Sequence, residues 1–195
     1  MVAAAVAPDV AADSVLERAA NGDLDAFATL WRTHHAALLR YLRTRAVACA
    51  DDVASTVWID VGSSISRFNG DGDDFRRWLF TIAHRRSVDE LRRTSRRREV
   101  VQPLVPDGAP GEPADRAFED GASLERAVEL VRRLPPEMAE AVMLRVVNDL
   151  SYADVAVILD TSVGNVRVLV HRGLRALRSK IAVTNPEHST MYMVS

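Results

Sequence analysis

The sequence is poor in cysteine and in long apolar runs, and each shortage excludes a class of protein. A single cysteine, Cys49, among 195 residues rules out a disulfide framework or a cysteine-rich metal site within the chain. We expect a reducing compartment and a lone buried thiol. No apolar segment reaches membrane-spanning length without charges. Residues 1–12 contain no basic residue, which indicates a frayed tail rather than a signal peptide. These shortages predict a soluble, cytoplasmic protein.

A basic total charge is also missing, since the net charge is −2, whereas nucleic-acid-binding domains are usually basic. The average conceals a segregation. Residues 75–98 hold nine arginines against two acids, residues 99–129 hold eight acids against two arginines, and residues 162–180 hold five basic residues and no acid. Two basic blocks are therefore separated by an acidic one. Lys180 is the only lysine, and arginine offers a planar fork that suits phosphates and guanine edges.

Apolar residues recur at helical spacing almost everywhere outside the middle of the chain, and strand-type alternation is nearly absent. The pattern predicts an all-α protein of two small helical domains joined by a flexible linker. Residues 101–122 have linker composition, with four prolines, three glycines and several acids. The predicted boundaries are 1–20 for a tail and short first helix, 21–100 for the first domain, 101–122 for the linker, 123–183 for the second domain and 184–195 for a tail.

The spacing also predicts the individual helices. In the first domain they begin at about Asp23, Asp51 and Asp74, and the third carries a buried stripe of Phe75, Trp78, Leu79, Ile82, Val88 and Leu91. In the second domain they cover about 124–134, 137–148 and 152–159, and a last helix follows Ser162 and reaches about 182. A capping box at Ser151 and Asp154 is expected to start the third of these.

Two short helices separated by a tight turn, the second basic and amphipathic, are typical of a helix-turn-helix. One face of the last helix is expected to be core: Val166, Leu169, Val170, Gly173, Leu174, Leu177 and Ile181. The opposite face has the side chains of a major-groove helix: Gly164, Arg167, Val168, His171, Arg175 and Arg178. A basic face can also be merely solvated, but the capped helix and the turn before it favour DNA contact. We expect Arg167 and His171 to meet base edges, and Arg172, Arg175 and Arg178 to meet phosphates.

The first basic block combines arginines with aromatic rings at Phe75, Trp78 and Phe80. Basic side chains with interleaved rings suit a strand whose bases are unstacked, because rings stack on bases and arginines follow the backbone. The alternative is that the rings belong to the core. We expect core packing of Trp78 and leave Phe80, which lies off the apolar stripe, as a candidate for base contact.

At this point the residues resemble a known family. The segment 75–93 is similar to conserved region 2 of sigma-70 type factors, especially the small extracytoplasmic-function (ECF) group. A second set of segments is similar to region 4 of that family: Leu134-Pro135-Pro136-Glu137, Leu144-Arg145, Leu150-Ser151-Tyr152-Ala153-Asp154-Val155-Ala156, Val166-Arg167 and His171-Arg172. The order, the spacing and the acidic linker between the two segments all agree with the family pattern.

The resemblance implies a sigma factor that brings core RNA polymerase to promoters. In the family, region 2 binds the polymerase clamp helices and captures an unstacked base of the −10 element, while region 4 reads the −35 element as duplex. The implied partners are core RNA polymerase, promoter DNA and an anti-sigma factor, which could hold the chain at the membrane.

Three sets of site residues follow from the resemblance. The core polymerase-binding set is Asp52, Ser55 and Thr56, the last two standing where a Gln-Glu pair is usual. The −10 set is Asn69, Arg76, Arg77, Phe80, His84, Arg85, Arg92 and Arg93, with Arg85 in place of a common Asn. The −35 set is Ser162, Gly164, Asn165, Arg167, Val168, His171, Arg172 and Arg175, and its departures at Asn165 and Val168 imply an unusual promoter preference.

The residues also bear on two other functions, an enzyme and a free-standing regulator. Neither a glycine-rich phosphate loop nor a nucleophile motif appears, and the adjacent His34 and His35 point to different sides of a helix. We therefore expect no enzymatic activity, no cofactor, no metal and no small-molecule substrate. The open alternative is a free-standing regulator that uses its helix-turn-helix without joining polymerase, although it gives no reason for the aromatic-basic helix.

Overall fold

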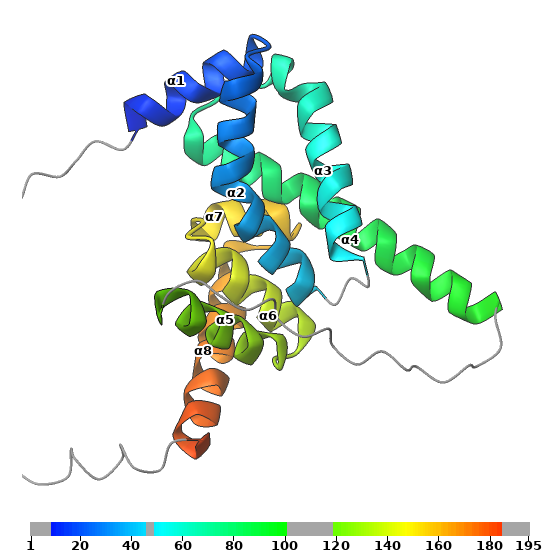
Figure 1. Ribbon diagram of the computed structural model, residues 1–195. Helices are drawn as coiled ribbons and strands as arrows, with labels where there is room; N and C mark the ends of the chain where they lie inside the picture. The colour runs from blue at the N-terminus through cyan, green and yellow to red at the C-terminus, as the bar shows by residue number, and fades with distance from the viewer. Residues whose placement is uncertain (1–8, 46–48, 101–118, 185–195) are drawn as a thin grey trace, which may run out of the picture.

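The computed structural model describes residues 9–45, 49–100 and 119–184, and this part of the chain is helical without a strand. The all-α prediction is confirmed. The helices form two groups that pack against each other (Figure 1). We call α1 to α4 the first module and α5 to α8 the second module. No helix in the described ranges combines the length and the apolar character that a membrane span needs.

The first module places its helices around a shared apolar core. The elements are α1 (Asp9–Ala20), α2 (Leu24–Thr44), α3 (Ala50–Ser64), the 3-10 turn η1 (Ile65–Arg67) and α4 (Gly72–Val100). Fully buried side chains at the centre include Leu38, Leu42, Val57, Val61, Phe75 and Leu79. Since α1 is helical from Asp9, the prediction of a frayed tail is wrong for residues 9–12, and residues 1–8 lie outside the described ranges.

The reversal between α1 and α2 shows how the local sequence fixes a helix start. Gly22 has φ 91°, a conformation that glycine adopts at little cost. The Asp23 carboxylate then caps α2 by accepting hydrogen bonds from the backbone N–H groups of Asp25 at 2.9 Å and Ala26 at 3.0 Å. Helix α2 therefore begins where the sequence predicts it.

The second module repeats the all-helical pattern with shorter elements. They are α5 (Glu119–Arg132), α6 (Pro136–Val142), the π-helical turn η2 (Met143–Val147), α7 (Tyr152–Ile158) and α8 (Val163–Thr184). Pro136 lies in the first turn of α6, where its missing N–H costs nothing. Helix α5 begins at Glu119, so the last residues of the predicted linker are helical, and residues 101–118 lie outside the described ranges.

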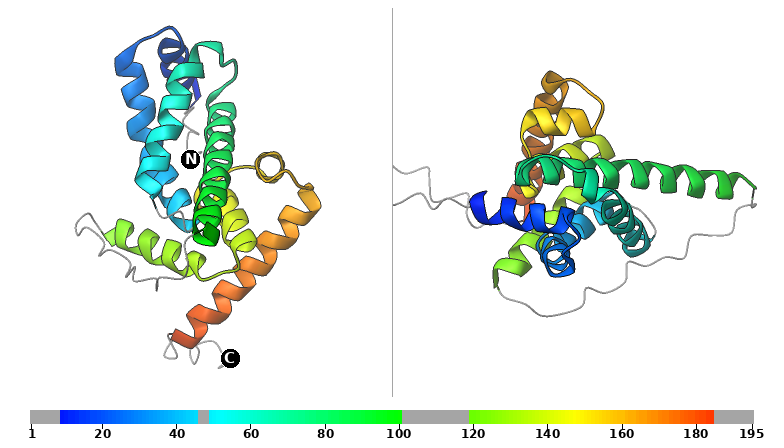
Figure 2. Two further views of the ribbon diagram at one scale, coloured as in Figure 1. Left: turned by 90° about the vertical axis from the view of Figure 1, so that its right-hand side faces the viewer. Right: turned by 90° about the horizontal axis from the view of Figure 1, so that it is seen from above.

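Two side chains differ from the sequence prediction because of where their helices lie. Cys49 is exposed, since it precedes α3 rather than facing the core, so the prediction of a buried thiol is wrong. Leu91 is also exposed, because the second half of α4 projects beyond the other helices of its module (Figure 2). Trp78 is partly buried and stacks on Phe68 with ring centroids 5.0 Å apart, which confirms its packing against the core.

The second module docks on the first along α2 and α4. Helix α6 and η2 contact α2, and α7 contacts α4; Figure 2 shows α7 beside the first half of α4. The two basic segments of the sequence lie on α4 and α8. Their surroundings differ, because α4 contacts the other module through α7.

Candidate nucleic-acid interfaces

A capping box starts α7, the first helix of the helix-turn-helix. The Ser151 hydroxyl accepts a hydrogen bond from the Asp154 N–H at 3.1 Å and donates one to the Asp154 carboxylate at 2.5 Å. The predicted Ser151 cap is confirmed, whereas the Asp154 carboxylate reaches back to the Ser151 hydroxyl rather than to its backbone N–H. This arrangement fixes the first turn of α7 and leaves the other oxygen of Asp154 for a partner outside the helix.

The turn between α7 and α8 is fixed by a left-handed residue and a second cap. Asp160 has φ 50°, and the following Thr161 N–H returns to the Ala156 carbonyl at 3.0 Å, the closure of a helix C-terminus. The Ser162 hydroxyl then accepts the Asn165 N–H at 3.1 Å and caps α8. The angle between the two helices is therefore set by short-range contacts.

Helix α8 has the two faces that its sequence predicts. Val166 and Val170 are buried, and Gly173 packs so closely on α6 that an added Cβ would lie 2.7 Å from Cγ2 of Val142. The opposite face is exposed along its length: Gly164, Arg167, Val168, His171, Arg172, Arg175 and Arg178. An exposed row of cationic and small side chains on a helix supported from behind can enter a major groove.

The ring of Tyr152 holds two guanidinium groups at the start of this surface. The Cζ atoms of Arg145 and Arg167 lie 5.0 Å and 5.6 Å from its centroid, within the range of cation–π attraction. The ring thus pre-orients Arg167. Arg145 is a candidate that the site prediction missed, because it lies in η2 and no spacing rule connects it with α8.

The α4 arginines of the predicted −10 set fall into two groups. Arg85, Arg92 and Arg93 are exposed on its outer part, and Arg93 keeps only a loose ion pair with Glu90 at 3.8 Å. Arg76 and Arg77, near the start of α4, instead reach the second module. The predicted −10 residues are therefore not one continuous open surface in this arrangement.

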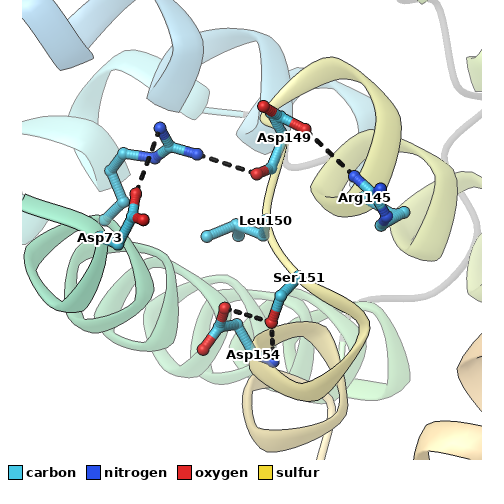
Figure 3. Close-up of a pocket in the computed structure, with 7 residues that line it drawn as sticks. Asp73, Arg145, Asp149, Leu150, Ser151 and Asp154 are labelled. Atoms are coloured by element: carbon cyan, nitrogen blue, oxygen red, sulfur yellow. Dashed lines mark hydrogen bonds and ion pairs between the residues drawn. The ribbon is translucent and has the colours of Figure 1, made fainter. Parts of the chain in front are cut away.

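The inner arginines bind the loop before α7 and α7 itself. Arg76 donates hydrogen bonds to the carbonyl oxygens of Asn148 at 3.1 Å and Asp149 at 2.9 Å. Arg77 donates to the Asp154 carboxylate at 3.1 Å. Arg76, Asp149 and Asp154 are among the residues that line a cavity of about 250 Å³, shown in Figure 3. Although burial alone would raise the pKa of Asp154, hydrogen bonds from Ser151 and Arg77 lower it, so the carboxylate is ionised at neutral pH.

Phe80 requires a correction. Its ring is 2% exposed and packs edge-on against Tyr41 with centroids 5.4 Å apart. Base stacking needs an open ring face, and this ring has none. Phe80 is therefore a core residue in this structure, and its assignment to DNA contact is withdrawn.

The predicted polymerase-binding residues share one exposed face of α3. Asp52, Ser55 and Thr56 are all exposed, and the hydroxyls donate back to the carbonyls of Asp51 and Asp52 at 2.9 Å and 3.0 Å. Ile59, three to seven residues further on, extends the same face and is 70% exposed. The site prediction missed Ile59, although its position off the apolar stripe of α3 was a usable signal.

The loop before α4 is anchored where it meets that helix, and Asn69 is exposed on it. The Asp71 carboxylate accepts the Asp74 N–H at 2.8 Å and caps α4. The Gly72 N–H donates to the Asp13 carboxylate of α1 at 3.1 Å. The predicted base-capturing loop is thus held against α1, with Asn69 facing solvent.

Two family models match this chain. The sigma-70 region 2 model matches residues 30–97, and the sigma-70 region 4 model matches residues 124–177. The chain belongs to the sigma-70 family. Region 2 thus covers most of α2 together with α3 and α4, and region 4 covers α5 to α8 up to residue 177. The resemblance noted in the sequence is confirmed.

Curated relatives place the chain in the ECF group of this family. It is 32% identical over 169 residues to the ECF RNA polymerase sigma factor BldN of Streptomyces coelicolor, covering 84% of this chain and 63% of BldN. It is 31% identical over 177 residues to the ECF RNA polymerase sigma factor SigD of Mycobacterium tuberculosis, covering 87% of this chain and 83% of SigD.

Solved structures share the fold. CnrH, in complex with the cytosolic domain of CnrY, aligns with a TM-score of 0.60 at 21% identity, over 89% of this chain and 98% of CnrH. The sigma factor RpoE of Bartonella quintana, in complex with the anti-sigma factor NepR, aligns with a TM-score of 0.63 at 20% identity, over 80% of this chain and 98% of RpoE.

Proposed function

We propose that the chain is a sigma subunit in which region 4 reads the −35 element as duplex through α8, while region 2 opens and reads the −10 element through α4. The observation that carries the proposal is the two-sided α8, whose apolar face is buried and whose cationic face is open. The functional units would be residues 21–100 and 123–183, joined by 101–122. Such a subunit supplies specificity, and polymerase supplies the chemistry.

The −35 contacts are proposed along the exposed face of α8. Arg167, pre-oriented by Tyr152, and His171 are placed to meet base edges near the start of the helix. Ser162, Gly164, Asn165 and Val168 lie in the same first two turns, while Arg172 and Arg175 are suited to flanking phosphates. Arg145 joins this set through its place on the Tyr152 ring.

The −10 contacts are proposed on α4 and the loop before it. Asn69, Arg85, Arg92 and Arg93 are exposed and available to an unstacked strand. Arg76, Arg77 and His84 belong to the same surface but contact the second module in this arrangement. Core polymerase would bind the α3 face of Asp52, Ser55, Thr56 and Ile59.

An anti-sigma protein is the second proposed partner. The solved structure of the sigma factor RpoE contains the anti-sigma factor NepR, and that of CnrH contains the cytosolic domain of CnrY. By analogy we propose that a protein of this kind covers the polymerase and DNA surfaces. Because promoters and polymerase are cytoplasmic, the working site of the chain would be the cytoplasm, with membrane retention through the anti-sigma protein.

Replacing Arg167 with alanine tests the region 4 assignment. If the side chain reads a base edge, Arg167→Ala weakens binding of the −35 duplex by about 1–3 kcal/mol. Fluorescence anisotropy with promoter duplex measures the loss. Arg132→Ala is the control, because it removes the same charge from α5, on the same module. An equal loss in both variants would show that only net charge matters and would remove Arg167 from the site.

The alternative, a free-standing regulator, differs in its relation to polymerase. Core enzyme immobilised on resin should retain the purified chain, and Ile59→Asp should abolish retention without weakening −35 duplex binding. A regulator would bind duplex but would not be retained by core enzyme.

A further inference from the structure

An apolar side chain lies in the middle of the cationic face of α8. Val168 is 45% exposed. It follows the buried Val166 by two residues and precedes the buried Val170 by two. Because an α-helix turns by about 100° per residue, Val168 lies about 160° around the helix axis from both. Its side chain is therefore on the side of α8 opposite the core, which is the side that would lie deepest in a major groove.

No apolar neighbour on its own helix covers Val168. The residues three and four positions away, whose side chains a helix brings into contact, are Gly164, Asn165, His171 and Arg172. Gly164 contributes no side chain, and the nearest atom that a Cβ there would meet is 3.8 Å away. The methyl groups of Val168 therefore have no packing role within α8, and the glycine beside them leaves room for the close approach of a partner.

The side chains beside Val168 are held in place by contacts of their own. The Asn165 amide donates a hydrogen bond to Oγ1 of Thr161 at 3.1 Å, and the Arg167 guanidinium lies over the Tyr152 ring. Valine itself has one strongly preferred χ1 rotamer in a helix. Binding through Val168 therefore costs less conformational entropy than binding through a long, flexible side chain.

The major groove offers one apolar group, the C5 methyl of thymine. Every base pair presents hydrogen-bond donors or acceptors there, and thymine adds the methyl group. An apolar side chain pressed against the polar edges removes their water without replacing the lost hydrogen bonds. A valine at the front of the helix therefore favours thymine over the other bases at the position that it meets.

We propose that Val168 selects a thymine in the −35 element by packing its methyl groups on the C5 methyl of that base. The inference rests on the proposed function, since it assumes that α8 enters the major groove, and it deepens that function by assigning one base. The cationic side chains around Val168 supply affinity through phosphates and polar base edges. Val168 supplies discrimination at one base pair.

Deoxyuridine tests the proposal, because uracil pairs as thymine does but lacks the C5 methyl. The full chain first selects a duplex from a pool of random-sequence duplexes. Each thymine of the selected duplex is then replaced by deoxyuridine, one at a time, and fluorescence anisotropy measures the affinity. One replacement should weaken binding about fourfold, which is the effect of losing one buried methyl group.

Val168→Ser identifies the side chain that meets this methyl group. The variant should bind the thymine duplex more weakly than wild type, and deoxyuridine at the identified position should have no further effect. Val157→Ser is the matched control, because Val157 is also exposed, at 65%, but lies on α7. The control should keep the sensitivity to deoxyuridine. Since both valines are exposed, both variants should keep the helical circular dichroism spectrum of wild type.

Two results would overturn the inference and leave the reading of the −35 element by α8 standing. The first is equal affinity of wild type for the thymine duplex and for every deoxyuridine duplex. The second is a Val168→Ser variant that keeps full sensitivity at the identified position, because the methyl group would then meet another side chain. A wild-type chain that binds its selected duplex no more tightly than a scrambled duplex would instead contradict the proposed region 4 function.

Discussion

Of the two glycines of α8, Gly173 has the less room for a side chain. A Cβ there would lie 2.7 Å from Cγ2 of Val142 and 3.4 Å from Cδ1 of Leu134, and valine is stiff about χ1. At Gly164, by contrast, the nearest atom that a Cβ would meet is 3.8 Å away. The two glycines of one helix therefore play different roles, one in packing and one on the open face.

We predict that replacing glycine with alanine has different effects on the free energy of unfolding at these two positions. Gly173→Ala costs about 1–3 kcal/mol of overpacking against a gain of roughly 1 kcal/mol in helix propensity, so the free energy of unfolding falls by up to about 2 kcal/mol. Gly164→Ala leaves it unchanged or raises it by up to about 1 kcal/mol. Urea unfolding measures both, and a stabilising Gly173→Ala would contradict the described packing of α8 on α6.

Single-residue roles could be predicted where a local rule governs them. The Ser151 cap and the buried Val166 follow from spacing within one helix, and the structure has both. Cys49 could not be placed, because its exposure depends on where α3 starts relative to the core. Ile59 was predictable in principle, since it lies off the stripe of Val53, Val57 and Val61, but an exposed isoleucine attracts attention only when its neighbours are known to be a binding face.

At the scale of helices, α4 explains why Phe80 was misassigned. Helical spacing predicts one buried stripe, through Phe75 and Leu79. Phe80, Ala83 and Ser87 form a second buried row, because α4 packs against more than one neighbouring element. A one-stripe pattern describes a helix at a surface, so a helix with two covered faces exceeds what periodicity alone predicts. The helix itself, in contrast, was predicted to within two residues at its start.

The packing of α2 on α4 makes the first module sensitive to acid. His34 lies 5.4 Å from Phe75, centroid to centroid, and burial together with the charge of Arg76 lowers its pKa to about 4. A lowered histidine pKa means that protonation favours the unfolded chain, whose pKa is near 6.5. Stability is therefore lost as the pH falls from about 6.5 to about 4.

Between pH 7 and pH 5 this single group removes up to about 2 kcal/mol from the free energy of unfolding. His34→Gln, which cannot titrate, should show a loss smaller by that amount. Urea titrations at the two pH values measure the difference. The same loss in wild type and variant would show that His34 does not carry the acid sensitivity.

At the scale of the whole molecule, the docking of the two modules lay beyond sequence reasoning. Glu140 of the second module binds Tyr41, Arg45 and His84 of the first across up to 99 positions, and no periodicity connects a residue of α6 with one of α2. Each looks like an ordinary polar residue in its own helix. The two-module organisation was nevertheless predictable, because charge segregation and linker composition depend only on chain order.

The central claim is that this chain, added to core RNA polymerase, chooses where transcription starts. The most direct measurement is transcription in vitro by core enzyme plus the purified chain on genomic fragments, with mapping of the RNA 5′ ends. We predict a defined set of start sites that share one upstream motif in the −10 region and a second near −35, and loss of these sites with Arg167→Ala. Start sites identical to those of core enzyme alone would contradict the account.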